Sequence, residues 1–164
     1  MRKFLTLTLM ALVALMPFSA VALDSAQDGK VDVLVALTLA ETVELDFGAV
    51  ADADGTVTLD ITNTIASDPG AIHQGGTVQS GVYTITGSAS TLVDVSIAAT
   101  NANGLNLSNF TTNVGGGVFP LVGVSTDGTG ALAMTLGADL QVQSGVAAPG
   151  SNQSLAFTVT VVYN

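Results

Sequence analysis

Apolar and polar residues alternate along most of the sequence, a pattern that is typical of β-strands with one buried face. The alternation is longest over residues 31–47. Because ordinary strands have about five or six residues, we expect this run to divide near Ala40-Glu41 into two strands or one bulged strand. Further strands are predicted at residues 56–62, 81–86, 91–98, 105–110, 118–124, 131–142 and 155–164, with a break in 131–142 at Gly137.

Glycine-containing pairs separate these runs and predict turns. Asp54-Gly55 predicts a hairpin turn and Asn103-Gly104 predicts a turn, whereas residues 63–80 are expected to form a loop or an excursion at a sheet edge. The chain has 18 glycines and no sustained helical period of apolar residues. We therefore predict an all-β fold, a single immunoglobulin-like antiparallel β-sandwich of about eight or nine strands.

The N-terminal residues 1–22 have the organisation of a secretory signal peptide. Arg2 and Lys3 precede an apolar run at residues 4–16, and the small residues Ala20-Val21-Ala22 follow. An uncleaved membrane anchor is the alternative, but the run is short for a membrane span. We expect a signal peptide at 1–22, an N-terminal extension at 23–36 and a sandwich domain at 37–164. The exported protein would have no membrane insertion after cleavage.

The charge of the chain restricts its partners. The net charge is −10, and the thirteen acidic residues all follow residue 22, where Lys30 is the one cation. Such a surface repels phosphate backbones, so nucleic-acid binding is excluded. The chain has no cysteine, so stability must come from packing and strand pairing.

Few residues are suited to catalysis. His73 is the single histidine, and no nucleophile elbow accompanies it, so we expect an exposed loop histidine. Glu44 and Asp46 share one strand face and are interpreted as a solvated outer surface, while Glu41 interrupts the opposite, apolar row. The sequence therefore predicts a protein that is not an enzyme and has no cofactor.

Asp52-Ala53-Asp54-Gly55 resembles the opening of a calcium loop, because alternating carboxylates followed by glycine can surround a hard cation. The next ligands of such a loop are missing. A hairpin turn that ends in Asp-Gly is the favoured interpretation, and weak calcium binding at Asp52 and Asp54 is left open.

Both ends of the predicted domain carry apolar rows that need a neighbouring strand. At a chain end that neighbour can belong to another molecule. The first row, a candidate donor strand, is formed by Val31, Val33, Val35, Leu37 and Leu39. The second row, a candidate interface on the last strand, is formed by Leu155, Phe157, Val159, Val161 and Tyr163. Whether residues 31–39 pair within their own molecule or with another one is left open.

Several short motifs resemble a family of secreted bacterial domains of unknown function that is related to the spore-coat-U and Csu-type pilins. These motifs are Leu37-Thr38-Leu39, Leu45-Asp46-Phe47-Gly48, Gly55-Thr56-Val57-Thr58-Leu59, Tyr83-Thr84-Ile85-Thr86-Gly87 and Phe157-Thr158-Val159-Thr160-Val161-Val162-Tyr163.

The resemblance implies a pilin-like fold of the chaperone-usher class. In that class the sandwich is incomplete, and its groove is filled by the N-terminal extension of the next subunit. Tyr163 matches the penultimate tyrosine of such pilins. Gly150 lies near, but not at, the usual glycine position, and the cysteines of many such pilins are missing.

The expected function is therefore a secreted structural subunit of a bacterial surface filament, with a role in adhesion or biofilm formation. We expect self-association by strand complementation, after passage through the periplasm to the cell surface. A periplasmic chaperone and an outer-membrane usher are the further partners that the resemblance implies. The alternative is a monomeric secreted binding module that recognises a carbohydrate or a surface through loops at 63–80 or 111–117.

Overall fold

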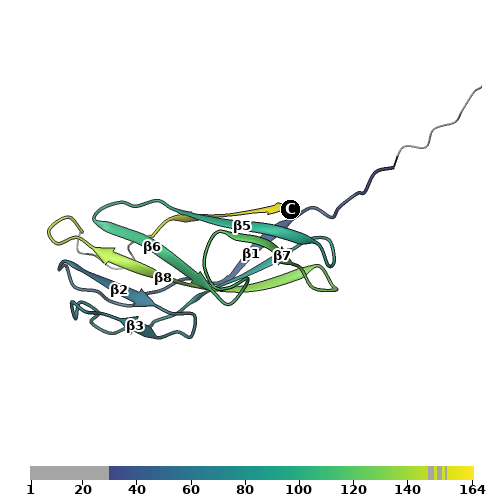
Figure 1. Ribbon diagram of the computed structural model, residues 1–164. Helices are drawn as coiled ribbons and strands as arrows, with labels where there is room; N and C mark the ends of the chain where they lie inside the picture. Colours follow the sequence, from purple (N-terminus) through teal and green to yellow (C-terminus); the bar gives the residue numbers. More distant parts are fainter. Residues whose placement is uncertain (1–29, 148–149, 151–152, 154) are drawn as a thin grey trace, which may run out of the picture. The chain divides into compact units, whose positions relative to one another are not determined.

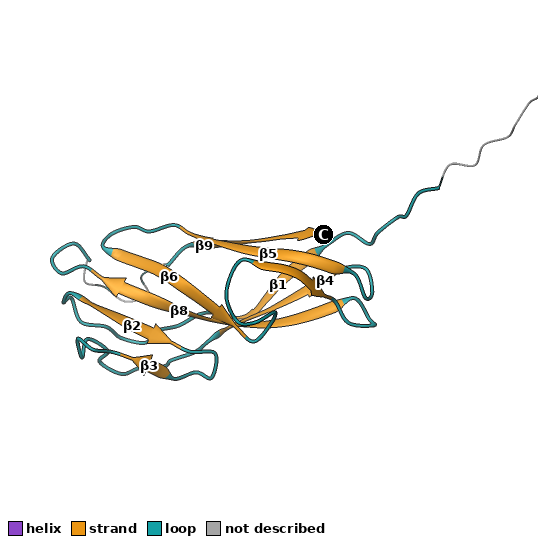
Figure 2. Ribbon diagram, viewed as in Figure 1, coloured by secondary structure: helices purple, strands orange, loops and turns teal. Residues whose placement is uncertain are grey.

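The computed structural model describes residues 30–147, 150, 153 and 155–164 (Figure 1). Within this part of the chain every regular element is a β-strand (Figure 2). The strands are β1 (Thr38–Val43), β2 (Gly55–Leu59), β3 (Ile65–Ser67), β4 (Gly81–Thr86), β5 (Leu92–Ala99), β6 (Leu105–Thr112), β7 (Leu121–Ser125), β8 (Ala131–Val142) and β9 (Phe157–Tyr163). The predicted signal peptide and residues 23–29 of the extension lie outside the described residues.

All strand pairs are antiparallel, and they form two sheets. The larger sheet has the order β1-β4-β8-β2-β3, with β6 also paired to β8, and the smaller sheet has the order β7-β5-β9. The first half of β8 pairs with β4, and its second half pairs with both β2 and β6. The predicted all-β class and antiparallel β-sandwich are confirmed.

The core lies between the two sheets and is built from the inward rows of their strands. The predicted rows are confirmed in particular on β2 and β5, where alternate residues are buried. Fully buried apolar side chains from both sheets include Val57, Leu59, Ile85, Val93, Val95, Met134 and Leu136. This core belongs to the compact unit Val33–Asn164.

The predicted break at Gly137 is wrong, because β8 continues through this residue. A Cβ atom at position 137 would lie 2.5 Å from the carbonyl oxygen of Leu59 and 2.9 Å from Thr111 Oγ1. Glycine is required here by the close approach of neighbouring chains on both sides of β8, and not by a turn.

The first predicted strand is much shorter than the alternation that suggested it. β1 ends at Val43, and a register shift lies between Glu41 and Val43, just after the predicted division. Beyond β1, Leu45 and Phe47 keep the alternation and are buried. In this segment, side chains are therefore buried in alternation although the residues lie outside any strand.

Two turn predictions had different outcomes. Asn103 and Gly104 both have positive φ (55° and 72°), and Ala102 and Leu105 exchange two backbone hydrogen bonds, so the predicted turn is confirmed. The hairpin turn predicted at Asp54-Gly55 is wrong, because Gly55 begins β2 and lies under Ile72.

The predicted loop at 63–80 contains a short strand, β3. The turn before it is held by Asp60, whose carboxylate accepts hydrogen bonds from the amides of Thr62 (2.7 Å) and Thr64 (3.0 Å). Asn63 adopts positive φ (61°) within this turn. These polar residues form a hairpin connection that the apolar pattern alone does not reveal.

Candidate functional site: a groove between two edge strands

Among the strands with an edge that is not paired within the described residues, β1 of the larger sheet and β9 of the smaller sheet lie beside the same groove. β1 pairs with β4 on one side, and β9 pairs with β5 on one side. All backbone hydrogen bonds of the β9 segment in this part of the chain go to the β5 side, including Thr100 to Ala156 and Asn164 to Leu92. Each strand therefore presents a row of backbone groups that can accept a further strand.

The two edge strands run in opposite directions beside one groove. At one end, the Tyr163 hydroxyl contacts the Val35 carbonyl oxygen, just before β1. Further along, the rings of Phe157 and Tyr83 pack edge to face with centroids 6.2 Å apart, and Tyr83 is the strand partner of Glu41. A strand inserted between β1 and β9 would be antiparallel to one of them and parallel to the other.

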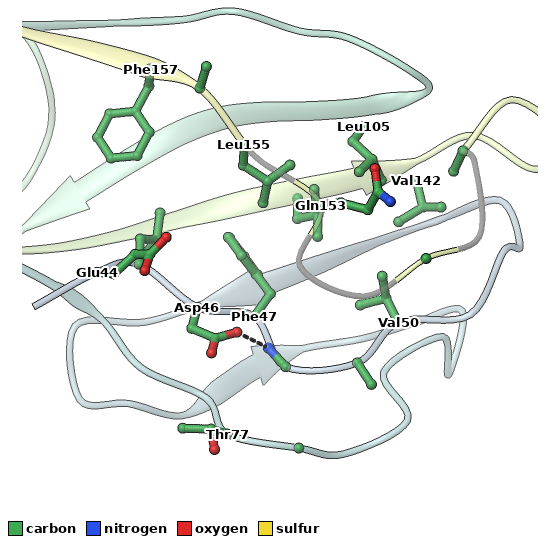
Figure 3. Close-up of a pocket in the computed structure, with 18 of the residues that line it drawn as sticks. Glu44, Asp46, Phe47, Val50, Thr77, Leu105, Val142, Gln153, Leu155 and Phe157 are labelled. Atoms are coloured by element: carbon green, nitrogen blue, oxygen red, sulfur yellow. Dashed lines mark hydrogen bonds between the residues drawn. The ribbon is translucent and has the colours of Figure 1, made fainter.

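The groove has a volume of about 1270 Å³ and lies along β1, the segment that follows it, and β9. Leu39 lines it from β1, and Phe157 and Val159 line it from β9. Figure 3 shows Phe157 on one side and Glu44 and Phe47 on the other. The buried residues of the lining are Leu45, Phe47, Tyr83, Leu140 and Val142.

The sandwich is only partly closed along this groove. The inward row of β9 is half-buried along its whole length. In the neighbouring strand β5, by contrast, the inward residues Val93 and Val95 are fully buried. β1 is exposed at every residue except Val43, and Leu39 retains 40% of its accessible surface. Apolar side chains on both walls thus have surface that an additional strand can cover.

The donor candidates occupy two different environments. Val31, Val33 and Val35 are 83%, 88% and 59% exposed. Leu37 instead packs against the core, and Leu39 is paired with Ile85 in β1. The part of the predicted donor row that is exposed and lies outside the sheets is therefore Val31, Val33 and Val35.

The residues of the C-terminal row also divide. Leu155, Phe157 and Val159 line the groove, whereas Val161 and Tyr163 pack against the core near its end. Phe157, Val159, Val161 and Tyr163 lie on the half-buried face of β9 that the sequence predicted, and Leu155 precedes the strand.

Tyr163 closes the end of the groove by holding the backbone of Val35. Its hydroxyl donates to the Val35 carbonyl oxygen (2.5 Å) and accepts from the Ser88 amide (2.7 Å), and Ser88 Oγ accepts from the Val35 amide (2.7 Å). Gly87 leaves room for this contact, because a Cβ there would lie 2.5 Å from the Tyr163 hydroxyl. We call this arrangement of Val35, Ser88 and Tyr163 the Val35 clamp.

One wall of the groove is acidic. Glu41, Glu44, Asp46 and Asp52 line it. The Tyr83 hydroxyl donates to Glu41 Oε1 (2.7 Å). Burial raises the pKa of Tyr83 strongly, and the carboxylates of Glu41 and Glu44 raise it further. The sequence pattern placed Glu41 on one strand face and Glu44 and Asp46 on the opposite one, whereas all three line this groove.

The calcium candidate has a structural role. Asp54 Oδ1 accepts from the Ser144 amide (2.8 Å), and Asp52 Oδ1 accepts from the Gly145 amide (2.9 Å). Both carboxylates thereby hold the segment after β8 against the segment before β2. Among the described residues, no group of three or more His, Cys, Asp or Glu side chains is arranged to hold a metal ion.

His73 is partly buried, so the prediction of an exposed loop histidine is wrong. Its amide donates to Asp68 Oδ2 (2.9 Å), and it forms an isolated bridge with Val50. Its Nε2 atom is buried without a hydrogen-bond partner in the part of the chain that the structure describes. The ring therefore fills space beneath Gly48, where a Cβ would lie 3.2 Å from Nε2.

None of the described residues forms a helix with the length and hydropathy that a membrane crossing requires.

Comparison with known proteins gives one finding. Residues 37–163 match the family described as a domain of unknown function (DUF4402). No curated protein and no solved structure matches the chain. The match includes all nine described strands and both walls of the groove, so the chain belongs to the DUF4402 family.

Proposed function

We propose that this protein is a secreted structural subunit of a bacterial surface filament, and that its copies assemble by strand complementation. In this proposal the extension of one copy occupies the groove of the next, and the filament serves adhesion or biofilm formation. The protein acts without catalysis and without a cofactor. The observation that carries the proposal is the groove between the unpaired edges of β1 and β9.

The exposed extension has the chemistry that such a groove needs. Val31 and Val33 lie on one face of an extended strand, and they precede Val35, whose backbone is held by the Val35 clamp of its own copy. Each valine contributes about 1.5–3 kcal/mol when fully buried, as an upper value. Main-chain hydrogen bonds to β1 and β9 add to this, while ordering and association costs offset part of it.

Such a contact is head-to-tail and does not close on itself. The groove and the extension are different surfaces, so each copy can accept one neighbour and donate to another. This geometry produces filaments. The resemblance to spore-coat-U and Csu-type pilins supports the same proposal. On that basis, a periplasmic chaperone and an outer-membrane usher are the further proposed partners of this protein.

A matched pair of substitutions tests the proposal. Val33→Asp should abolish assembly, because it places an unpaired charge in an apolar groove. Leu34→Asp adds the same charge on the opposite face of the strand and should leave assembly intact. Filaments and SDS-resistant ladders of the exported protein provide the measurement. Normal ladders from Val33→Asp would contradict the proposal, and a strictly monomeric wild type with glycan affinity would support the alternative binding module.

A further inference from the structure

The acidic wall of the groove creates a requirement for whatever occupies it. Four carboxylates line the groove, and the described lining residues include no lysine, arginine or histidine. An occupant that is entirely apolar would take these carboxylates partly out of water without replacing the lost solvation. A strand that also carries a cation at the wall would compensate for this cost.

Glu44 is the carboxylate best placed to receive such a cation. The other three already accept hydrogen bonds: Glu41 from Tyr83 (2.7 Å), Asp46 from the Gly48 amide (2.8 Å) and Asp52 from the Gly145 amide (2.9 Å). The Glu44 carboxylate makes no hydrogen bond to any described residue. Its exposed side chain lies beside the buried Leu45, at the rim of the groove.

The extension carries one cation, and it stands next to the apolar row. Lys30 is the only lysine or arginine among the described residues, and it is exposed. In an extended strand whose valines at 31 and 33 face the floor of a groove, Lys30 and Asp32 point toward the rim. Lys30 of the inserted strand is thus directed toward the rim of the accepting groove, where Glu44 lies.

We propose that Lys30 of one copy pairs with Glu44 in the groove of the next copy, and that this pair sets the register of the inserted strand. The inference rests on the strand complementation proposed above, and it identifies the occupant as the extension of a second copy. A shift of two residues would keep the apolar face inward but would place Asp32 beside Glu44. Like charges directly opposite each other destabilise a strand pair, so this register is disfavoured.

Charge reversal at each position tests the pair in the full-length protein. Lys30→Glu and Glu44→Lys should each lower the self-association constant about fivefold or more at low salt, because each replaces an attractive contact by a repulsive one. An equimolar mixture of the two variants should restore association. In alternating order, one junction has the native pair and the next has the reversed pair, so every junction joins opposite charges.

Two controls separate the pair from net charge. Lys30→Arg keeps the cation and should associate like the wild type. Val122→Lys adds a cation at an exposed position of β7, on the edge of the small sheet opposite β9, and should also leave association unchanged. Wild-type association should weaken as salt rises from 0.1 M to 1 M, since the Debye length falls from about 10 Å to about 3 Å. The Lys30→Glu variant should not weaken in this way.

Sedimentation equilibrium across this salt series gives the association constants. If Val33→Asp abolishes association while Lys30→Glu associates like the wild type, the pairing is overturned and strand complementation stands. If the mixture of Lys30→Glu and Glu44→Lys stays as weak as either variant alone, the pairing is likewise overturned. If the wild type does not associate and Val33→Asp changes nothing, both inferences are overturned.

Discussion

Single carboxylates hold several turns of this protein. Asp127 Oδ1 accepts from the hydroxyl and amide of Thr129 (2.7 and 2.8 Å) and from the amide of Ala131 (2.9 Å). Asp60 and Asp94 accept comparable hydrogen bonds. Since hydrogen bonds to a carboxylate stabilise its charged form, the pKa of each of these three groups is lowered.

A pH dependence follows from these lowered pKa values. The hydrogen bond from Thr129 is the largest cause of the lowered pKa of Asp127. The contribution of ionised Asp127 to the free energy of unfolding is therefore present above its unfolded-state pKa and is lost as pH falls through its folded-state pKa. We expect the free energy of unfolding to decrease below about pH 4. Urea denaturation at several pH values should show a smaller decrease for Asp127→Asn. An identical acid limb in both proteins would contradict this role.

The Val35 clamp can be tested by removing one hydroxyl group. Tyr163→Phe keeps the ring but loses the hydrogen bonds to Val35 and Ser88, so we expect unfolding to require about 1–3 kcal/mol less. Amide exchange at Ser88 should become faster in the variant. Unchanged protection of the Ser88 amide would show that the hydroxyl does not hold this end of the groove.

The strands differ in how completely they are paired. β8 has partners along both edges of its second half, whereas β1 and β9 each have one partner among the described strands. The central position of β8 brings neighbouring backbone close to Gly137, and the edge positions of β1 and β9 leave the groove open. Strand position, more than strand composition, therefore distinguishes a structural element from a candidate interface.

Gly137→Ala tests the packing around β8. The added Cβ would lie 2.5 Å from the carbonyl oxygen of Leu59, and backbone must move to accept it. We expect a loss of about 1–3 kcal/mol in the free energy of unfolding, measured by chemical denaturation. Gly128→Ala is the matched control, because nothing lies within 4 Å of a Cβ there. Equal stability of both variants would contradict the close approach at β8.

At the scale of the molecule, the exposed row at Val31, Val33 and Val35 and the open groove are complementary in chemistry. One is an apolar segment that precedes β1, and the other is an apolar surface between two unpaired strand edges. This complementarity makes the two features functionally separable. A copy that keeps the groove but lacks the donor row can accept a neighbour and cannot donate to one.

Deletion of residues 23–34 should give such a copy. We expect the deleted protein to remain folded and monomeric, because the first side chain that packs against the core is Leu37 and the first strand begins at Thr38. Added to the wild type, it should shorten the filaments in proportion to its share of the mixture, since it occupies ends without extending them. Electron microscopy measures the length distribution. Filaments of unchanged length would contradict a groove that accepts the extension.

Much of the fold could be predicted from the alternation of apolar and polar residues. β4 spans the predicted residues 81–86, and Val57, Leu59, Val93 and Val95 are buried as expected. β3 was missed because its turn depends on polar side chains such as Asp60. The break at Gly137 was predicted wrongly because a glycine required by a close contact has the same sequence pattern as one required by a turn.

The sequence by itself determined the strand class, the buried faces of β2 and β5 and the apolar rows at both ends of the domain, because these depend on a two-residue period that is local in the chain. The tertiary structure decided which edges remain unpaired among the described residues, and so where the groove lies. It also placed Leu37 and Leu39 in the sandwich, Glu41 and Glu44 on the groove wall and Tyr163 at its end. These features depend on contacts between residues far apart in the chain, and a local pattern does not encode which strands become neighbours.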